Sequence, residues 1–440
     1  MTAGPKRPTA ADFIVAVPPP APPSPAAPQR FLSLDATRGF AVMGILLLNI
    51  IAFAMPEEAY VNPTAWGGNG VADRLSWFID FTLFDGKFRG LFSLMFGASA
   101  LLVMERAEEG GRDGRAAHLN RIFWLFVFGC LHFTLLWWGD ILRIYAVLGL
   151  VLLMFREHEP LSLVKAAFLC FLIHFAIAVG IVLTGYMFQH QATLPHAAPD
   201  AVASWTNMRQ GFGAPDAATV GRELALHRGP FAGLAAHQLA KLPGDILNGV
   251  MLAGFDTLGF MLIGMAMLKS GFLTGQWPRE QYGRTARHCF TIGLPPMIAL
   301  GIWAWASGFA VLPTFGSFYA WSFPFRIPLV VGYAALFQWL IAAHRDHWAI
   351  ARVAAAGRAA FSNYLGTSIL MAFCFYGWGL GLYGRVARVE LIAFVLLAWA
   401  IMLLWSKPWL DRFAYGPFEW LWRCLSRRRL EPLLRAKESQ

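Results

Sequence analysis

Long apolar runs recur along most of the chain and are separated by short polar segments. The runs are roughly 18 to 25 residues long, so a helix that rises 1.5 Å per residue could cross a hydrocarbon core about 30 Å thick. Runs of this length are typical of proteins whose solvent is the lipid bilayer. The pattern predicts an all-α fold, a polytopic bundle of transmembrane helices.

About ten spans are expected from these runs. They are placed near residues 36–55, 78–104, 119–138, 140–155, 162–188, 244–268, 287–309, 318–343, 358–379 and 390–406. The second run is too long and too charged for one straight helix, and its segment 85–90 offers a natural break. A broken or re-entrant element is expected there, which a membrane tolerates only where protein surrounds it.

The spans and the segments between them divide the chain into five parts. The parts are a Pro/Ala-rich tail at 1–30, a membrane half of about five spans at 31–188, a periplasmic loop at 189–243, a second membrane half of about five spans at 244–406 and a cytoplasmic interfacial tail at 407–440. The first part is expected to be disordered because its composition buries little apolar surface. It lacks the pattern of a signal peptide, so the first span is expected to be an uncleaved anchor.

Composition and charge support a membrane location. Hydrophobic residues make up 57% of the chain and charged residues 14%, whereas soluble domains carry about 25% charged residues. The net charge of +10 comes from arginines between the apolar runs, where they act as topology signals rather than as a nucleic-acid-binding face. The short outer loops are poorer in Lys and Arg, apart from Arg385 and Arg388. This distribution predicts that both termini are cytoplasmic.

Motifs of soluble enzymes and metal sites are absent from the sequence. Its five cysteines are scattered, without a CxxC pair, and there is no Walker loop, GxSxG elbow or HExxH motif. We therefore expect no metal and no tightly bound cofactor. The expected partners are the lipid bilayer and a small-molecule substrate, with no nucleic acid, and the sequence leaves the oligomeric state open. Any chemistry is expected to be embedded in the membrane.

Charged and amide side chains within the spans are the main functional candidates, because burying them in a membrane is costly. Asp35 and Arg38 lie three residues apart at the start of the first span and can form an ion pair on one helix face. They are candidates for substrate binding, although a helix cap with a topology anchor is an equal alternative. Asn49 lies some three turns deeper, where its amide needs a polar partner.

A second group of candidates surrounds the turn between the third and fourth spans. The sequence Trp137-Trp138-Gly139-Asp140 is typical of a tight turn at the membrane interface. His132 would lie about 9 Å below this turn, from the helix rise. Beside Asp140 it could act as a general base, while a packing histidine is the alternative. His132 and Asp140 are the catalytic candidates, and Arg143 is a candidate for substrate binding.

Further charged residues could line the same region. Lys87 and Arg89 lie within the expected break. Asp245 and Asn248 begin the sixth span, Asp256 lies near its middle, and Arg326 lies in the eighth span. If these residues face inward with the second group, they form a polar cavity that opens to the periplasm. Lys87 and Arg89 are candidates for substrate binding.

The last group of candidates lies at the expected cytoplasmic face. Asn363 and Tyr364 begin the ninth span, and Glu419 lies in the aromatic segment that follows the tenth. An aromatic segment with flanking arginines is typical of an interfacial helix. Anchoring alone and closure of a cytoplasmic pocket are both possible roles for this segment. Asn363, Tyr364 and Glu419 are candidates for substrate binding.

Several short motifs together resemble the YeiB-like family of bacterial inner-membrane proteins, whose C-terminal half defines a domain of unknown function. The motifs are Leu34-Asp35 with Arg38-Gly39 and Gly44 to Asn49, Lys87-Phe88 with Leu91-Phe92-Ser93-Leu94-Met95-Phe96-Gly97, Gly139-Asp140-Ile141-Leu142 with Tyr145-Ala146, Gly357-Arg358 with Ser362-Asn363-Tyr364, Tyr376-Gly377, and Tyr415-Gly416-Pro417-Phe418-Glu419-Trp420-Leu421-Trp422-Arg423. The resemblance covers nearly the whole chain after residue 30. It implies a multi-pass protein of the bacterial inner membrane.

That family is similar, through its Asp-x-x-Arg-Gly opening and its number of spans, to transmembrane acyltransferases that include the heparan glucosaminide acetyltransferases. This similarity implies transfer of an acyl group from cytoplasmic acyl-CoA to a periplasmic or lipid-linked acceptor. Asp35 and Arg38 would then form the donor entrance, and Lys87 and Arg89 would contact anionic groups. His132 with Asp140 would activate the acceptor.

One departure from the sugar acetyltransferases is clear. They carry a histidine beside a Trp-Asn-Gly stretch before the second span, whereas residues 65–70 of this chain have no neighbouring histidine. Their acetyl-transfer mechanism therefore does not carry over intact, and His132 is a substitute candidate. A small-molecule transporter or exporter remains the alternative, because buried ion pairs and a broken span also suit a transport pathway. A non-catalytic, partner-binding membrane protein is the third possibility.

Overall fold

A computed structural model describes residues 31–68 and 70–435. The described residues from Leu32 onward belong to one compact unit. The tail predicted at 1–30 lies outside the described residues, as do Asn69 and residues 436–440.

Helices make up almost all of the regular structure in the described part of the chain. The α-helices are α1 (Leu32–Ala54), α2 (Glu58–Val61), α3 (Val71–Ile79), α4 (Lys87–Glu109), α5 (Gly114–Leu135), α6 (Leu142–Leu152), α7 (Pro160–Ala192), α8 (Pro199–Gly211), α9 (Ala217–Arg228), α10 (Phe231–Lys269), α11 (Arg279–Ala306), α12 (Val311–Gly316), α13 (Phe323–Ala343), α14 (Trp348–Arg358), α15 (Ala360–Phe375), α16 (Leu391–Arg412) and α17 (Pro417–Arg427). Two π-helical segments, η2 (Asp80–Phe84) and η4 (Ser317–Trp321), and two 3₁₀ turns, η3 (Leu153–Phe155) and η5 (Arg388–Glu390), complete them.

Eight helical segments of the described chain are long and apolar enough to cross a membrane. They are Leu32–Ala54, Val71–Glu109, Gly114–Leu135, Pro160–Ala192, Phe231–Lys269, Arg279–Ala306, Phe323–Ala343 and Arg388–Arg412. Two shorter apolar helices, Leu142–Phe155 and Ala360–Phe375, fall where the fourth and ninth spans are expected. The predicted fold class, an all-α bundle of transmembrane helices, is confirmed. The count of ten spans and the side on which the termini lie stay predictions.

Burial differs between the central and the peripheral helices. Within the most apolar window of α1, 78% of the residues are buried, whereas the corresponding windows of α7 and α11 are 28% and 22% buried. The outer faces of α7 and α11 carry large apolar side chains such as Phe168, Leu172 and Ile302. A soluble protein rarely exposes apolar surface of this extent, so these faces are suited to contact lipid.

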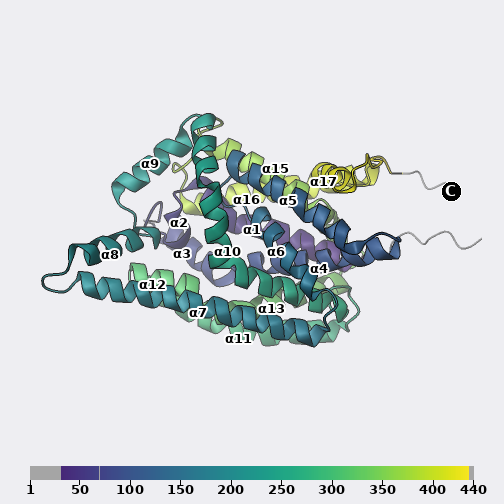
Figure 1. Cartoon of the computed structure of the whole chain (residues 1–440), viewed down its shortest axis with the longest axis horizontal. Helices are drawn as coiled ribbons and strands as arrows, with labels where there is room; N and C mark the ends of the chain where they lie inside the picture. The colour runs from purple at the N-terminus through teal and green to yellow at the C-terminus, as the bar shows by residue number, and fades with distance from the viewer. Residues whose placement is uncertain (1–30, 69, 436–440) are drawn as a thin grey trace, which may run out of the picture. The chain divides into compact units, whose positions relative to one another are not determined.

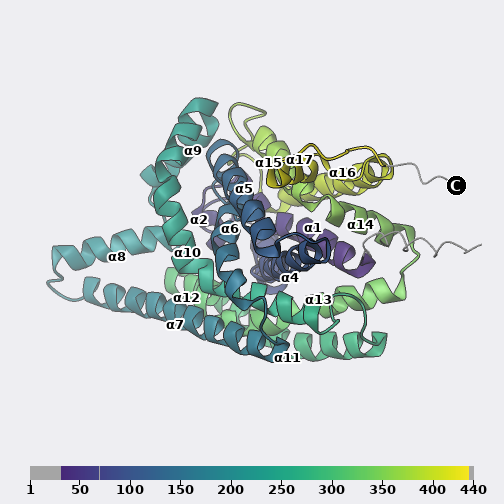
Figure 2. The ribbon, with the colours of Figure 1, turned by 45° about the vertical axis from the view of Figure 1, so that its right-hand side comes forward.

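The bundle has two ends that can be identified by the short helices placed there. Helices α8 and α9 lie at one end and α17 at the other (Figure 1), and in the turned view α17 lies beside α15 and α16 (Figure 2). At the α17 end, Trp422 donates a hydrogen bond to the Arg121 carbonyl near the start of α5, at 2.9 Å. At the α9 end, Gly377 beyond the end of α15 donates to the His227 carbonyl, at 2.8 Å. These two ends are called the α17 end and the α9 end below.

Glycines allow α4 and α10 to approach each other closely. A Cβ atom on Gly97 would lie 2.0 Å from the Met261 carbonyl oxygen, and one on Gly264 would lie 1.9 Å from that of Leu94. No side chain larger than hydrogen fits at either position. Such small residues let transmembrane helices pack backbone to backbone. The crossing fixes α4 against α10, which carry the two halves of a buried ion pair.

The break expected near residues 85–90 is present and is short. The π-helix η2 ends at Phe84, Asp85 is extended, and Gly86 has a φ of +71° before α4 begins at Lys87. A left-handed φ suits glycine because a Cβ atom would be strained there. A Cβ at Gly86 would also lie 2.5 Å from Cδ of Arg326 on α13. The run predicted as one span at 78–104 is therefore two helical pieces.

The segment 189–243, expected as a loop, is largely helical. It contains α8, α9 and the beginning of α10, which starts at Phe231 and continues through Pro243. Helix propensity from sequence is a weak guide in such polar segments. The sixth expected span therefore begins well before residue 244.

Candidate functional site

Buried polar side chains gather in two clusters. The first, named the dyad cluster, consists of His132, Asp140, Arg143 and Asp245, from α5, α6, α10 and the turn between α5 and α6. The second, named the central cluster, consists of Asp85, Lys87, Arg89, Asp256 and Arg326, together with the polar residues bonded to them. Charged groups inside a membrane bundle are by default candidates for function.

The dyad cluster forms where α5 turns into α6. The backbone N–H groups of Leu136 and Trp137 both donate to the His132 carbonyl and so end α5 in a tight turn. The turn places the Asp140 carboxylate 2.8 Å from Nδ1 of His132. The backbone N–H of Arg143 donates to the other oxygen of Asp140, at 3.1 Å. His132 and Asp140 are each 2% exposed, so this hydrogen bond is shielded from water.

Arg143 joins the dyad to α10. Its guanidinium forms an ion pair with Asp245 and lies 3.9 Å from the Asp140 carboxylate. It also stacks 3.8 Å from the centre of the Phe133 ring. Arg143 is 1% exposed, whereas the Asp245 side chain is 37% exposed. Asp245 is therefore the nearer carboxylate partner of the guanidinium, and Asp140 is the more distant one.

His132 keeps one ring nitrogen unused. Because an ionised carboxylate only accepts hydrogen bonds, Nδ1 of His132 carries the proton and Nε2 is left as an acceptor. This Nε2 atom is buried and has no hydrogen-bond partner among residues 31–68 and 70–435. The ring lies 5.1 Å from the ring of Tyr364, between centroids. A histidine that is oriented by a carboxylate and has a free Nε2 is the arrangement of a general base.

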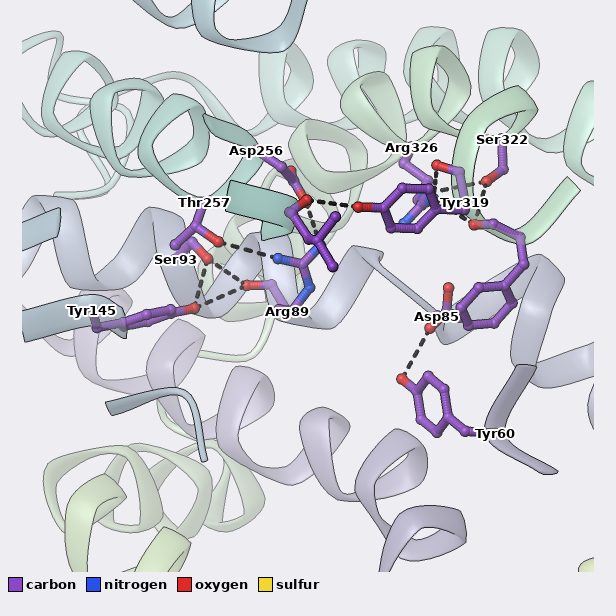
Figure 3. Close-up of polar contacts among 12 residues, drawn as sticks. Tyr60, Asp85, Arg89, Ser93, Tyr145, Asp256, Thr257, Tyr319, Ser322 and Arg326 are labelled. Atoms are coloured by element: carbon purple, nitrogen blue, oxygen red, sulfur yellow. Dashed lines mark hydrogen bonds and ion pairs between the residues drawn. The ribbon is translucent and has the colours of Figure 1, made fainter. Parts of the chain in front are cut away.

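The central cluster is built around an ion pair between α4 and α10. Arg89 forms this pair with Asp256 and donates to the Thr257 hydroxyl at 3.1 Å (Figure 3). Ser93 and Tyr145 share a hydrogen bond of 2.6 Å one turn further along α4. The Asp256 side chain is 2% exposed and that of Arg89 is 27% exposed. Water is therefore excluded from the Asp256 carboxylate but reaches part of the Arg89 side chain.

Two further cations of the central cluster bind backbone carbonyls near the break. Lys87 is fully buried and its Nζ donates to the Phe81 carbonyl at 2.5 Å. Arg326 donates to the Phe318 carbonyl at 2.6 Å and to the Ser322 hydroxyl at 3.1 Å (Figure 3). Both cations hydrogen-bond to backbone carbonyl groups of π-helical segments, Phe81 in η2 and Phe318 in η4. The irregular backbone and the buried cations therefore satisfy each other.

The candidates at the start of α1 lie apart from both clusters. Arg38 pairs with Asp35 at 3.2 Å and donates to the Ser99 hydroxyl on α4 at 2.9 Å. Lys87, expected to contact anionic donor or acceptor groups, lies about 18 Å from Ser99 along α4, from twelve residues of helix. The structure thus does not bring Lys87 to Arg38. Asn49 is half-buried, and its amide makes no hydrogen bond with any residue that the structure describes.

Asn363 and Glu419 are occupied by structural contacts. Asn363 donates to the Ala356 carbonyl and the Ser406 hydroxyl at 3.0 and 3.1 Å and accepts from Trp405 at 2.8 Å. It therefore fastens α14, α15 and α16 together. Glu419 accepts from the backbone N–H groups of Phe361 and Ser362 at 2.7 and 3.0 Å, at the start of α15. A carboxylate is stabilised at a helix N-terminus by the unpaired N–H groups there.

Sequence reasoning missed several members of these clusters. The hydroxyl groups of Ser93, Tyr145 and Thr257 join the central cluster, although nothing in their spacing marks them as polar partners of Arg89. Arg388 is 2% exposed and donates to the Ala59 carbonyl, but in the sequence it stood out only as a charge in an outer loop. The sequence did contain one signal for Arg388, because the positive-inside rule predicts that an outer loop is poor in arginine.

Comparison with known proteins gives relatives of similar length. The family described as "Protein of unknown function (DUF418)" matches residues 267–429. The chain is 32% identical over 417 residues to the "Uncharacterized protein YeiB" of Escherichia coli (strain K12), which covers 92% of this chain and 98% of that protein. It is 28% identical over 416 residues to the "Uncharacterized protein YxaH" of Bacillus subtilis (strain 168), with 90% and 94% covered.

Proposed function

This chain belongs to the YeiB family, which carries the domain of unknown function DUF418, and we propose that it is a bacterial inner-membrane acyltransferase. It would move an acyl group from cytoplasmic acyl-CoA to a hydroxyl or amine of a periplasmic or lipid-linked acceptor. Membrane-length helices support the location. The arginines at the α17 end support a cytoplasmic position for that end.

The buried pair of His132 and Asp140 is the observation that carries the proposal. Asp140 fixes the ring through Nδ1 at 2.8 Å, and Nε2 remains buried and unpaired among the described residues. A packing histidine usually satisfies both ring nitrogens, because a buried unpaired acceptor costs free energy. His118 on the same helix contacts a backbone carbonyl in place of a carboxylate, with its Nε2 donating to Gly149 at 2.9 Å. His174 and His227 also have a buried, unpaired ring nitrogen, so the carboxylate partner on the opposite nitrogen is what distinguishes His132. The free nitrogen of His132 is therefore suited to receive a proton from an acceptor.

In the proposed reaction Nε2 of His132 takes the proton from the acceptor hydroxyl or amine. The acceptor oxygen or nitrogen forms a bond to the thioester carbonyl carbon, and the carbon–sulfur bond breaks. Coenzyme A leaves as the thiolate and takes up the proton that His132 received. Asp140 stabilises the imidazolium that forms between these steps.

The position of the dyad sets a requirement for the donor. Arg121 and Arg38 lie at the α17 end, where cations could bind the phosphates of acyl-CoA. His132 lies about 16 Å further along α5 than Arg121, from eleven residues at 1.5 Å each. The acyl end of the donor would have to reach that far into the bundle. Asp35 and Arg38 at the donor entrance are consistent with this path.

A transfer assay with labelled acyl-CoA tests the proposal. Membranes from cells that express the protein receive the label on the cytoplasmic side, and acylated lipid and polar products are then separated and counted. We expect labelled product with the wild type and at least about a 100-fold lower rate with His132→Asn, the usual range for loss of a general base. His118→Asn is the matched control, and it should retain the rate. Equal rates in the wild type and in His132→Asn would exclude this role for the dyad.

Transport of a small molecule is the second candidate function, and the central cluster favours it. The buried pair of Arg89 and Asp256 lies beside the helix break at Asp85–Gly86. Ion pairs and broken helices within a bundle are common at transport sites. Reconstituted liposomes distinguish the two proposals, because a transporter moves its substrate without acyl-CoA and an acyltransferase leaves a covalent product.

A further inference from the structure

Arg121 near the start of α5 carries a positive charge that forms no ion pair with any residue the structure describes. Its guanidinium lies 3.8 Å from the centre of the Trp422 ring, and the Trp422 indole N–H donates to its backbone carbonyl at 2.9 Å. The carboxylate that attracts it, Glu419, is bound instead to backbone N–H groups at the start of α15. Stacking fixes the plane of the guanidinium and leaves the N–H groups at its edge to bind an acceptor.

Three further arginines lie around this guanidinium. Arg38 on α1 and Arg423 and Arg427 on α17 are all close enough to repel Arg121 electrostatically. The Nε atom of Arg423 is buried and has no hydrogen-bond partner within the described part of the chain. Like charges that the fold holds together favour the binding of an anion between them.

The segment around α17 has an excess of positive charge. Residues 414–435 contain five arginines and two glutamates, which gives a net charge of +3. One carboxylate, that of Glu431, is shared by three of these arginines. They are Arg423, Arg427 and Arg429, at 4.0, 3.1 and 2.7 Å. Arg428 and Arg435 are exposed, so the segment presents an uncompensated basic surface.

The same segment presents exposed leucines on an ordered backbone. After α17 the chain turns back, and the Trp420 indole N–H donates to the Glu431 carbonyl at 2.8 Å. Leu434 forms an isolated β-bridge with Phe413. Leu430 and Leu434 are nevertheless 85% and 69% exposed. Apolar side chains held outward among arginines suit the boundary between lipid headgroups and acyl chains.

The position of the arginines in the bundle favours a lipid over a soluble anion. Helix α17 lies at one end of the bundle (Figure 1) and contacts α5, which is long and apolar enough to cross a membrane. Phe123, two residues beyond Arg121, is 59% exposed, and Leu421 on α17 is 36% exposed. Basic pockets between helices at the end of a span bind the headgroups of anionic lipids. A soluble phosphate would leave these exposed apolar side chains unexplained.

We propose that Arg121, Arg423 and Arg427 form a binding site for the phosphate of an anionic phospholipid. The site assigns Arg121 to lipid and leaves Arg38 to the acyl donor. It goes beyond the proposed acyl transfer and does not depend on it, because lipid binding is measured without acyl-CoA. Failure of one proposal therefore does not decide the other.

Native mass spectrometry of the purified full-length protein tests the site. Delipidated protein in detergent receives equal amounts of phosphatidylglycerol and phosphatidylcholine with identical acyl chains, and the first lipid bound is identified. Both lipids carry a phosphate, but only phosphatidylglycerol has a net negative charge. We expect phosphatidylglycerol to be preferred at least about fivefold, the effect of one arginine at a membrane surface. The preference should fall as the salt concentration rises.

Soluble phosphates distinguish the two sources of this chemistry. Coenzyme A and inorganic phosphate, each added in excess, should leave the bound phosphatidylglycerol in place. Displacement of the lipid by either compound would assign the arginines to a soluble ligand and overturn the proposal. Equal binding of the two lipids would overturn it as well.

Variants then locate the lipid to the arginines. Arg121→Gln should reduce the preference for phosphatidylglycerol to less than about twofold and leave phosphatidylcholine binding unchanged, whereas a folding defect would lower the binding of both lipids. Arg287→Gln, at an exposed arginine on α11, is the matched control and should keep the wild-type preference. If Arg121→Gln fails to fold, Arg428→Gln combined with Arg435→Gln changes only exposed side chains and should also reduce the preference. A wild-type preference in these variants would contradict the site.

Discussion

His132 and Asp140 are eight residues apart in the sequence and are joined by a buried hydrogen bond of 2.8 Å. The bond crosses the turn between α5 and α6, so a local segment builds it. Asp140 also accepts from the backbone of Arg143 at 3.1 Å, which leaves the carboxylate held on both oxygens. The geometry fixes which nitrogen of the histidine is free.

Asp140→Asn should lower the rate of acyl transfer about 100- to 10,000-fold with little change in the KM for acyl-CoA. The amide no longer stabilises the imidazolium and no longer enforces the proton on Nδ1. Initial rates at varied acyl-CoA concentration separate the two parameters. The comparison variant is Asp245→Asn. Asp245 contacts the dyad only through Arg143, so this substitution should lower the rate of acyl transfer less than tenfold. Similar losses in both variants would mean that Asp140 acts through packing and not through His132.

Arg89→Gln should destabilise the protein by about 3 kcal/mol, because it leaves the buried carboxylate of Asp256 charged and unpaired. Asp256→Asn should cost less, because the Arg89 side chain that it leaves unpaired is 27% exposed. The double variant should recover at least half of that loss, since it removes both charges. Thermal unfolding in detergent measures all three. The exposed pair of Arg156 and Glu108 is the matched control, at 28% and 44% side-chain exposure, and its removal should cost less than about 1 kcal/mol. Independent, additive losses from Arg89 and Asp256 would contradict the pairing.

Features that depend on neighbouring residues could be predicted from the sequence. Apolar runs of membrane length predicted the long helices, and a charged segment that contains Asp85 and Gly86 predicted the break before α4. The turn at residues 137–140 placed Asp140 over His132 because both lie on one hairpin. In each case the geometry follows from helix rise and turn chemistry over a few residues.

Contacts between distant segments could not be predicted in the same way. Arg89 and Asp256 are 167 residues apart and meet only because glycines let α4 and α10 pack closely. Arg388 reaches Ala59 across 329 residues, and Glu419 reaches Ser362 across 57. A single sequence shows which residues are charged in a span but does not show which helix faces them. The roles assigned to the site residues stay predictions for the same reason.

Glu419→Ala should loosen α17 from the bundle without unfolding the membrane helices. The carboxylate accepts from the N–H groups of Phe361 and Ser362 and from the Ser362 hydroxyl, so its loss leaves the start of α15 uncapped. A loss of about 1 to 3 kcal/mol is expected for such charge-assisted hydrogen bonds. Hydrogen exchange measured at residues 414–428 should become faster in the variant.

Glu419→Gln tests whether shape or charge matters at this contact. Burial raises the pKa of the Glu419 carboxyl above its ordinary value. A neutral amide oxygen can still accept from the two backbone N–H groups, so this variant should show a smaller change than Glu419→Ala. Asp411→Asn serves as the control, because Asp411 pairs with Lys407 at an exposed position. Unchanged exchange in Glu419→Ala would contradict a structural role and favour a direct contact with ligand.

The last prediction concerns a buried glutamate at the α9 end. Glu223 on α9 accepts from the Glu57 backbone N–H at 2.9 Å and from the Tyr383 hydroxyl at 2.8 Å, both through Oε1. It therefore joins α9 to the start of α2 and to the loop after α15. Burial, together with the nearby carboxylates of Glu58 and Glu57, raises the pKa of Glu223 from 4.5 to about 7, although the hydrogen bonds that it accepts act in the opposite direction.

The folded protein consequently binds a proton at Glu223 more tightly than the unfolded chain does. This contribution to stability is fully present below pH about 4.5 and is lost as the pH rises through about 7. His227 on the same helix has the opposite effect, because burial lowers its pKa to about 4 and stability is lost as the pH falls below about 6.5. Both effects operate in the wild type, so its pH profile alone does not separate them.

Glu223→Gln isolates the glutamate, because Oε1 of the amide can still accept both hydrogen bonds while the charge is gone. We expect the variant and the wild type to unfold at similar temperatures near pH 5. The variant should be the more stable by on the order of 2 kcal/mol at pH 8. Thermal unfolding in detergent between pH 5 and 8 measures the difference, and the exposed Glu280→Gln should show none. A wild type that gains stability over Glu223→Gln as the pH rises would show that Glu223 is stabilised as a carboxylate, which would reverse the inferred electrostatics of the α9 contact.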